Sequence, residues 1–449
     1  MALINSRRHV PGSLREIADV AWPIVVSMLS YTAMGVTDTL LVGQIGRTEL
    51  AAVGIGTTAF FLVNSFMLGI LHGVKIVSAQ ATGSGLHEKV KDAAWMGIAI
   101  AIPASFLVIT LSLFSGPIFA VLGGPPQVQE LAVDYFSLRV WASPFWYVVI
   151  AINDHYLGKG DTRTPMRVNL VANGVNIVAD VIFIFGFGPI SAMGVEGAAA
   201  GTVVASVVGM IMVGYTFLRT VSARPRWQPD VLREVFRLGL PIGVRNAMGV
   251  MGFTLFTAIL ARLGEAHLAA HQVAIKIVSL SFLPGYGISE AATVLVGQYV
   301  GAGKRSLARL SYTSAMRLGI GVMGTMGFVF VLAPEMLIRL FTDDAEVLVI
   351  GCALLRIGAF FQVLDAIAMV ATGALNGTGD TRYTAVASVG ASWLVMVPTA
   401  YTLAIPAGLG AAGAWLGITA EIAVLALILS LRFRGDRWER GTKGSRVRT

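Results

Sequence analysis

Two aspartates interrupt long apolar stretches of the sequence. Asp38 lies late in the stretch that begins near Leu14, and Asp180 lies in a later stretch that also contains Asn173 and Asn176. A carboxylate costs about 3 kcal/mol or more at the centre of a membrane-spanning helix, so a chain that keeps one there is expected to use it. Asp38 and Asp180 are therefore the first candidates for chemistry.

A threonine and two asparagines are predicted to lie beside these acids. Counted at about 1.5 Å per helical residue from the nearer polar end, Asp38 lies about 9 Å deep, and Asp180 and Thr202 about 12 Å deep. Asn173, Asn176 and Asp180 share one helix face, because they are three and four residues apart. Carboxylate, amide and hydroxyl oxygens suit Na⁺ when both acids are ionised, and the acids share a proton when one is not. The alternative is a polar network that only holds helices together.

The composition predicts the elements that position these residues. Of the 449 residues, 55% are apolar and only 13% are charged, and the mean hydropathy is +0.75. A soluble domain is about one quarter charged, so soluble and disordered classes are excluded. A single cysteine excludes a disulfide framework and a cysteine-ligated metal site. Membrane spans of about 20 residues account for the chain as twelve helices. The expected helices are 15–44, 50–79, 93–115, 131–157, 166–188, 193–218, 238–263, 272–300, 311–333, 347–375, 384–405 and 410–431.

The basic residues predict how these helices cross the membrane. With twelve spans both termini lie on one side, and 25 of the 33 basic residues fall in the connectors and tails of that side. The opposite connectors hold only Arg47, Arg262 and Arg339. Such a bias predicts a multi-pass protein of the cell (inner) membrane with both termini in the cytoplasm. The net charge of +8 is therefore attributed to topology and not to nucleic-acid binding.

The sequence repeats itself after 218 residues. This shift aligns LREIADVAWPI (14–24) with LREVFRLGLPI (232–242), and close to it GVEGAAAG (194–201) matches GAAGAWLG (410–417). We expect an N-lobe of residues 1–218, a cytoplasmic linker 219–237, a C-lobe 238–431 and a basic cytoplasmic tail 432–449. Because each half has six helices, the predicted pseudo-two-fold axis runs along the membrane normal, with a substrate cleft between the lobes.

The two halves differ in the acids within their predicted membrane spans. At the shift, Asp38 corresponds to Phe256, and Asp180 corresponds to about Val397 or Pro398. The second half instead carries Asp365, where the first half has Tyr147. Retention in one half favours a functional role. Secondary acid candidates are Asp365 and Glu290, with Glu421 as a further intramembrane acid, whereas Arg139 and Arg356 are expected to snorkel or to pack within lobes.

The sequence motifs resemble those of a known family, the multidrug and toxic compound extrusion (MATE) transporters, along essentially the whole chain. The resemblance depends on WPI (22–24), VTDTLLVGQIG (36–46), LGEAHLAAHQVA (263–274), LVGQYVGAG (295–303), FFQVLDA (360–366) and paired GDTR elements. It implies an all-α integral membrane protein with 12 transmembrane helices in two pseudo-symmetric six-helix lobes.

The N-lobe is most similar to the prokaryotic DinF-type branch. There a helix-1 aspartate, matching Asp38, works with an Asn-xxx-Asp that matches Asn176 and Asp180. A helix-6 threonine and a helix-4 asparagine match Thr202 and Asn153.

The NorM-type branch pairs a helix-10 aspartate, matching Asp365, with a helix-7 glutamate. Here Gly249 stands at the position of that glutamate, which favours coupling in the N-lobe. Independently of the resemblance, Pro23 weakens the hydrogen bonding of the first helix and is a candidate hinge.

The resemblance implies a cation-coupled antiporter, using H⁺ and/or Na⁺, that exports amphipathic, often cationic organic compounds by alternating access. The alternative is a flippase of lipid-linked precursors. The sequence carries no enzyme motif, so we expect no catalytic residues, no cofactor besides the coupling ion and no metal other than Na⁺. The expected partners are drug-like small molecules and the lipid bilayer, with no nucleic acid, and we expect a monomer.

Overall fold

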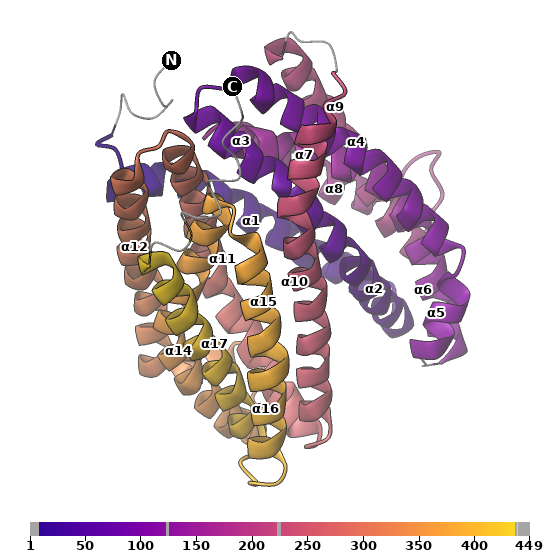
Figure 1. The fold of residues 1–449 in the computed structure, drawn as a ribbon. Coiled ribbons are helices and arrows are strands. Elements are labelled where there is room, and N and C mark those ends of the chain that lie inside the picture. Colours follow the sequence, from indigo (N-terminus) through magenta and orange to yellow (C-terminus); the bar gives the residue numbers. More distant parts are fainter. Residues whose placement is uncertain (1–8, 123–124, 222–225, 436–437, 439–449) are drawn as a thin grey trace. The chain divides into compact units, whose positions relative to one another are not determined.

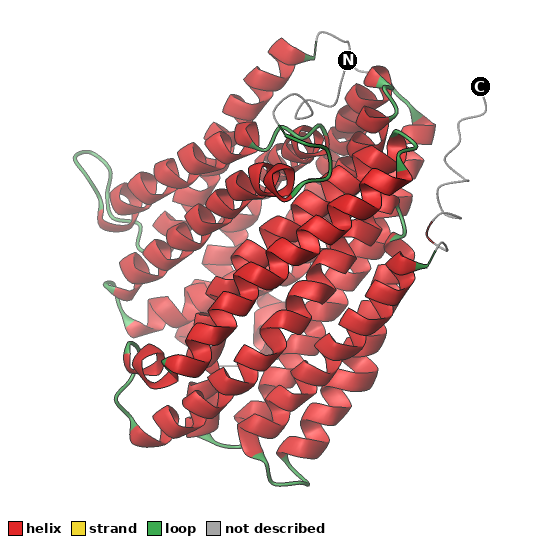
Figure 2. Cartoon of the chain, turned by 90° about the vertical axis from the view of Figure 1, so that its left-hand side faces the viewer, coloured by secondary structure: helices red, strands yellow, loops and turns green. Residues whose placement is uncertain are grey.

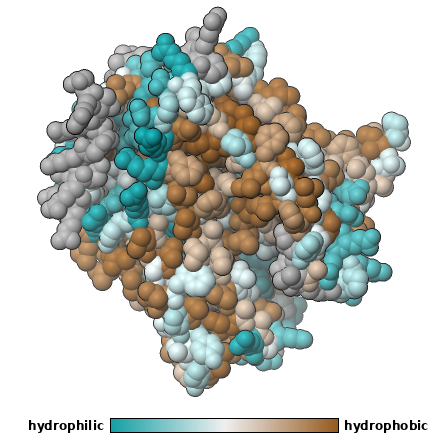
Figure 3. All heavy atoms as spheres, turned by 45° about the vertical axis from the view of Figure 1, so that its right-hand side comes forward, coloured by the Kyte–Doolittle hydropathy of each residue, from teal (hydrophilic) through white to brown (hydrophobic). Residues whose placement is uncertain are grey.

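A computed structural model describes residues 9–122, 125–221, 226–435 and 438. The predicted all-α class is confirmed, because these residues form helices and loops apart from one isolated β-bridge between Phe187 and Ile190 (Figure 2). Twelve helical segments are long and apolar enough to cross a membrane. On the face in Figure 3, apolar side chains cover a broad area, as expected of helices that contact lipid.

Figure 1 labels the helices along the chain. The twelve segments are α1 (Leu14–Gly43), α2 and α3 (Arg47–Leu71 and Gly73–Gly83), α4 (His87–Ser112), α6, η1 and α7 (Pro126–Arg139, Val140–Ala142 and Ser143–Gly158), α8 (Arg163–Phe185), α9 (Val195–Thr220), α10 (Pro229–Ala261), α11 (Glu265–Gly301), α12 (Arg305–Leu332), α14 (Ala345–Thr378), α15, η2 and α16 (Thr381–Ala391, Ser392–Met396 and Val397–Ala404) and α17 (Gly410–Arg434). Two short helices, α5 (Ser115–Leu122) and α13 (Pro334–Arg339), lie between them.

The largest difference from the predicted helix bounds is at the start of α10. This helix begins at Pro229, nine residues before the predicted residue 238 and inside the predicted linker. The added residues include Arg233 and Arg237, so a search for apolar runs misses them. Proline and Asp230 are favourable in a first helical turn. Residues 222–225 of the linker, and 436–437 and 439–449 of the tail, lie outside the described residues.

Two glycines on α9 allow it to pack closely against α8. A Cβ atom at Gly197 would lie 2.6 Å from the backbone of Phe183, and one at Gly201 would collide with Oδ1 of Asp180. Glycines four residues apart let helix backbones approach in this way. The packing therefore sets the position of Asp180.

The repeated sequence produces the same packing in the second half. On α17, a Cβ atom at Gly413 would lie 2.6 Å from the backbone of Leu403, and one at Gly417 would lie 2.7 Å from the backbone nitrogen of Ala400. Both neighbours belong to α16. The repeat thus encodes one helix-packing device twice.

The chain divides into two compact units that differ from the predicted lobes at α1, at α10 and at residues 82–85. One unit comprises residues up to Val25, Thr82–Gly85 and residues from Val244 onward, and the other comprises Val26–Ala81 and Leu86–Gly243. Helices α1 and α10 each pass from one unit to the other, two or three residues after Pro23 and Pro241 respectively. The lobe boundaries drawn from the sequence stay a prediction.

Each of these two helices is anchored at its start. In the unit that contains most of the second half, the buried Glu16 of α1 accepts hydrogen bonds from the Tyr299 hydroxyl at 2.9 Å and from the backbone N–H of Gly12 at 2.6 Å. In the unit that contains most of the first half, Glu234 of α10 pairs with Lys89 at 2.7 Å. Charged groups therefore hold both helix starts.

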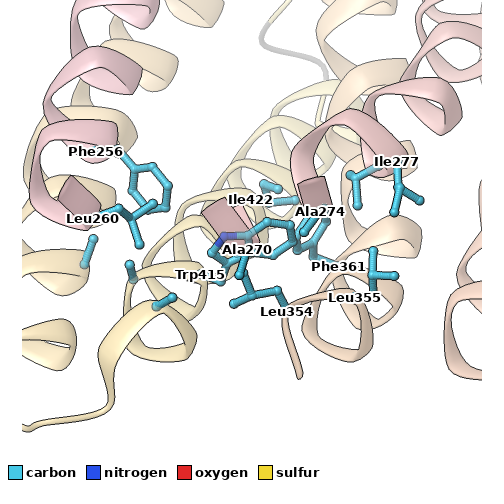
Figure 4. Packing of buried hydrophobic residues seen from close by; sticks show 14 of the residues in the cluster. Phe256, Leu260, Ala270, Ala274, Ile277, Leu354, Leu355, Phe361, Trp415 and Ile422 are labelled. Atoms are coloured by element: carbon cyan, nitrogen blue, oxygen red, sulfur yellow. The ribbon is translucent and has the colours of Figure 1, made fainter. Parts of the chain in front are cut away.

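Apolar clusters form the interior of each unit. In the unit that contains most of the second half, Phe256, Phe361 and Trp415 belong to a cluster contributed by α10, α11, α14 and α17 (Figure 4). In the other unit, Phe60 and Phe136 belong to a cluster from α2, α4, α6 and α7.

Candidate functional site

The carboxyl groups of Asp38 on α1 and Asp180 on α8 lie within hydrogen-bonding reach of each other. Oδ1 of Asp38 and Oδ2 of Asp180 are buried and receive no hydrogen bond from the described residues. Two ionised carboxylates at this separation repel, whereas a cation between them, or a proton on one, removes the repulsion. The structure thus brings together the two acids on which the sequence prediction depends.

Two asparagines of α8 support this pair. The Asn176 amide donates to Oδ1 of Asp180 at 3.3 Å, and neither residue has solvent-exposed surface. The Asn173 amide donates to the Ser30 hydroxyl of α1 at 2.9 Å. Ser30 precedes Asp38 by eight residues and Asn173 precedes Asp180 by seven, so α1 and α8 make polar contacts at two levels about two turns apart.

Thr202 lies next to the pair but is engaged by other groups. Its hydroxyl donates to the carbonyl of Ala198 at 3.1 Å and accepts from the Arg139 guanidinium at 3.2 Å. Its neighbour Gly201 packs against Asp180. Thr202 is therefore close to the acid pair, with Arg139 as its side-chain partner.

Asn153 is separated from the pair. Its amide donates to the Asn169 side chain at 3.3 Å, and Asn169 lies eleven residues before Asp180 on α8. Eleven helical residues span about 16 Å. The sequence prediction grouped Asn153 with the acids, but the structure places its contact about three turns away.

Arg139 is the residue that the sequence interpretation undervalued. Its side chain is 6% exposed, so it does not snorkel to a membrane surface. It interacts electrostatically with both Asp38 and Asp180. The available signal was that an arginine inside an apolar span is itself a functional candidate, by the same rule that singled out the aspartates.

The acids of the second half have different partners. Asp365 on α14 interacts electrostatically with Glu421 on α17, and Glu421 accepts a hydrogen bond from Ser392 at the start of the π-helical turn η2. Glu290 on α11 interacts with Arg245 on α10. The structure therefore supplies the partners that could not be named from sequence for Glu290 and Glu421.

The sequence analysis did not predict a cluster of charged side chains in the unit that contains most of the first half. Asp154 on α7 accepts from His72 Nδ1 at 2.8 Å and lies 3.7 Å from Lys75 Nζ. His72 is the residue between α2 and α3. Since Lys75 and Asp154 are both in predicted spans, their opposite charges were the signal for a pair.

The comparisons with known proteins agree with the repeat. The MatE family model matches residues 23–182 and 241–402, two segments that start 218 residues apart. A probable multidrug resistance protein NorM from Burkholderia mallei is 31% identical over 431 residues, which cover 93% of this chain and 92% of that protein.

Solved structures share the fold. A transporter of the MOP superfamily from Pyrococcus furiosus has a TM-score of 0.86 at 22% identity, with 98% of each chain covered. A multidrug resistance MATE family transporter in an outward-facing conformation has a TM-score of 0.88 at 22% identity, with 99% of each chain covered. Together with the matched family model and the NorM relative, the motifs lead to one conclusion: the chain belongs to the MatE family of membrane transporters.

Proposed function

We propose that this protein is a cation-coupled antiporter that exports amphipathic, often cationic organic compounds from the cell. The observation that carries this proposal is the Asp38–Asp180 pair, in which Asp180 is buried and Asp38 is half-buried, and which can exchange one cation per cycle. The NorM relative, named a probable multidrug resistance protein, supports the substrate class. The assignment to the DinF-type branch stays a prediction.

The coupling follows from the repulsion between the two carboxylates. In the absence of a cation the repulsion favours separating α1 from α8, and a bound H⁺ or Na⁺ removes it. α1 would then repack, with Pro23 as its weak point, because proline lacks the N–H that would bond to an earlier carbonyl. We expect repacking of α1 to change the walls of the predicted substrate cleft and so to release the drug by alternating access.

The proposed orientation has both termini in the cytoplasm of the inner membrane, and the protein acts as a monomer in the bilayer. A cation loaded from outside is then released to the cytoplasm while substrate leaves. The flippase alternative would be supported by movement of a lipid-linked precursor without cation exchange.

The test is export of a cationic dye from proteoliposomes under an imposed pH gradient and, separately, an imposed Na⁺ gradient. Wild type should export uphill with at least one gradient, and Asp38→Asn with neither. Asp19→Asn, an aspartate on the same helix whose partner His9 lies 3.8 Å away, is the matched control and should export normally. No uphill export by wild type under either gradient would contradict the proposal.

A further inference from the structure

Arg139, at the end of α6, is a firmly held guanidinium. Nη1 donates to the hydroxyls of Tyr135 and Thr202, and the guanidinium carbon lies 5.0 Å from the centre of the Phe60 ring and 5.4 Å from that of Tyr135. Nε is buried with no hydrogen-bond partner in the described part of the chain. Arginine stays protonated in proteins, so these contacts hold a permanent positive charge.

This charge acts on the acid pair without binding to it directly. Asp38, Asp180 and Tyr31 all interact electrostatically with the guanidinium. In the described part of the chain, no ion pair joins Arg139 to either aspartate. The carboxylate oxygens therefore stay available to an exchangeable cation, and the fixed positive charge of Arg139 acts on that cation electrostatically.

The sum of the charges limits how many cations the site takes. Two ionised aspartates and Arg139 sum to one negative charge, which one monovalent cation neutralises. A second cation would leave an uncompensated positive charge beside the buried Asp180 and Arg139, which is costly. The site is thus balanced for a single cation.

The contacts of Thr202 favour a proton over Na⁺. A proton needs one oxygen and at most a second that accepts from it, whereas Na⁺ needs several oxygen lone pairs at once. The Thr202 oxygen, one of the neutral ligands predicted for a metal cation together with the amide oxygens of Asn173 and Asn176, accepts from Arg139 and donates to Ala198. A Na⁺ ion on that oxygen would lie beside a guanidinium of the same sign.

We propose that Arg139 is a specificity-determining residue that makes the Asp38–Asp180 pair a site for one proton and excludes Na⁺ from it. The inference rests on the coupling role proposed for the pair. The two carboxylates by themselves can take either H⁺ or Na⁺. In this proposal Arg139, which lies outside the pair, decides between the two ions.

The experiment measures binding of radioactive Na⁺ to the purified full chain in detergent, with choline replacing Na⁺ to keep the ionic strength constant. Wild type should show no saturable binding. Arg139→Gln should gain saturable binding, at least about tenfold more bound Na⁺ than wild type at the same low Na⁺ concentration, because a nearby positive charge is removed from a poorly screened site. Arg139→Lys keeps the charge and should behave as wild type, and Arg139→Gln combined with Asp180→Asn should lose the gained binding.

Two results would overturn the proposal: saturable, Asp180-dependent Na⁺ binding by wild type, or no gain in a folded Arg139→Gln variant. If Arg139→Gln does not fold, Arg139→Met takes its place, since its unbranched side chain can pack on Phe60. If neither folds, the wild-type measurement decides. Because Na⁺ binding needs no substrate and no gradient, failure of ion selectivity and failure of transport are read separately.

Discussion

The two halves of the chain use the same helix packing for different purposes. Gly201 on α9 and Gly417 on α17 are repeat equivalents, and each allows a close helix approach. In the first half the close neighbour is Asp180, whereas in the second it is the backbone of Ala400. The scaffold is repeated and the acid is not, which separates residues that build the fold from residues that use it.

The same contrast appears at the first helix of each half. Asp38 faces a second carboxyl group, whereas its equivalent, Phe256, has no exposed surface and belongs to the apolar cluster of Figure 4. The Phe256 ring lies 5.5 Å from that of His271, which accepts a hydrogen bond from the Trp415 indole at 3.2 Å. An aromatic core has the place that ion chemistry has in the first half.

The largest expected effect comes from the acids of the first half. Asp38→Asn and Asp180→Asn should insert and fold but lose uphill export, because the amide keeps the shape and removes the exchangeable charge. The double variant should be no worse than either single one, since both change one ion site. The measurement is gradient-driven export from proteoliposomes, and export at the wild-type rate by Asp38→Asn would contradict the assignment.

The glycines test whether scaffold and site are separable. Gly201→Ala and Gly417→Ala should each destabilise by about 1–3 kcal/mol, the typical cost of overpacking. Only Gly201→Ala should also impair coupling, because its neighbour is Asp180. Melting temperature and export are measured in parallel. Gly214→Ala, on α9 with no atom within 4 Å of the added carbon, is the control and should leave export unchanged without lowering the melting temperature.

A third prediction concerns the pH dependence of substrate binding. If a proton on the pair displaces substrate, wild-type affinity falls as pH decreases, by about tenfold per pH unit at most. Asp38→Asn should flatten the curve. Among the described residues of its unit, the titratable groups that interact with the pair are Arg139 and Tyr135. A wild-type curve that is flat between about pH 5 and 8 would exclude proton coupling here.

The smallest effect is expected in the second half. Asp365→Asn should change the export rate by less than about threefold, or about 0.7 kcal/mol, because Asp365 lies outside the proposed coupling site. If this variant abolishes cation dependence while Asp38→Asn does not, the comparison is reversed and the C-terminal acids carry the coupling.

The sequence alone determined the features that depend on periodicity and composition. Twelve apolar stretches predicted twelve spans, and the shift of 218 residues predicted the repeat that the family model matches twice. The depth of Asp38 and Asp180 within their helices predicted that they would meet, because helical rise converts residue number into depth. The structure places their carboxyl groups within hydrogen-bonding reach.

Only the tertiary structure decided which side chains at one depth contact each other. Depth is set along each helix, whereas contact depends on how helices rotate and cross. This is decided by packing against residues that are distant in sequence, as Gly201 of α9 is from Asp180. For this reason Asn153 contacts Asn169 and not the acids, and Arg139 lies buried beside the pair and bonds to Thr202. The sequence pattern of one helix does not specify how its neighbour is rotated. For this reason Arg139 could be identified as the positive charge next to the acid pair only from the folded chain.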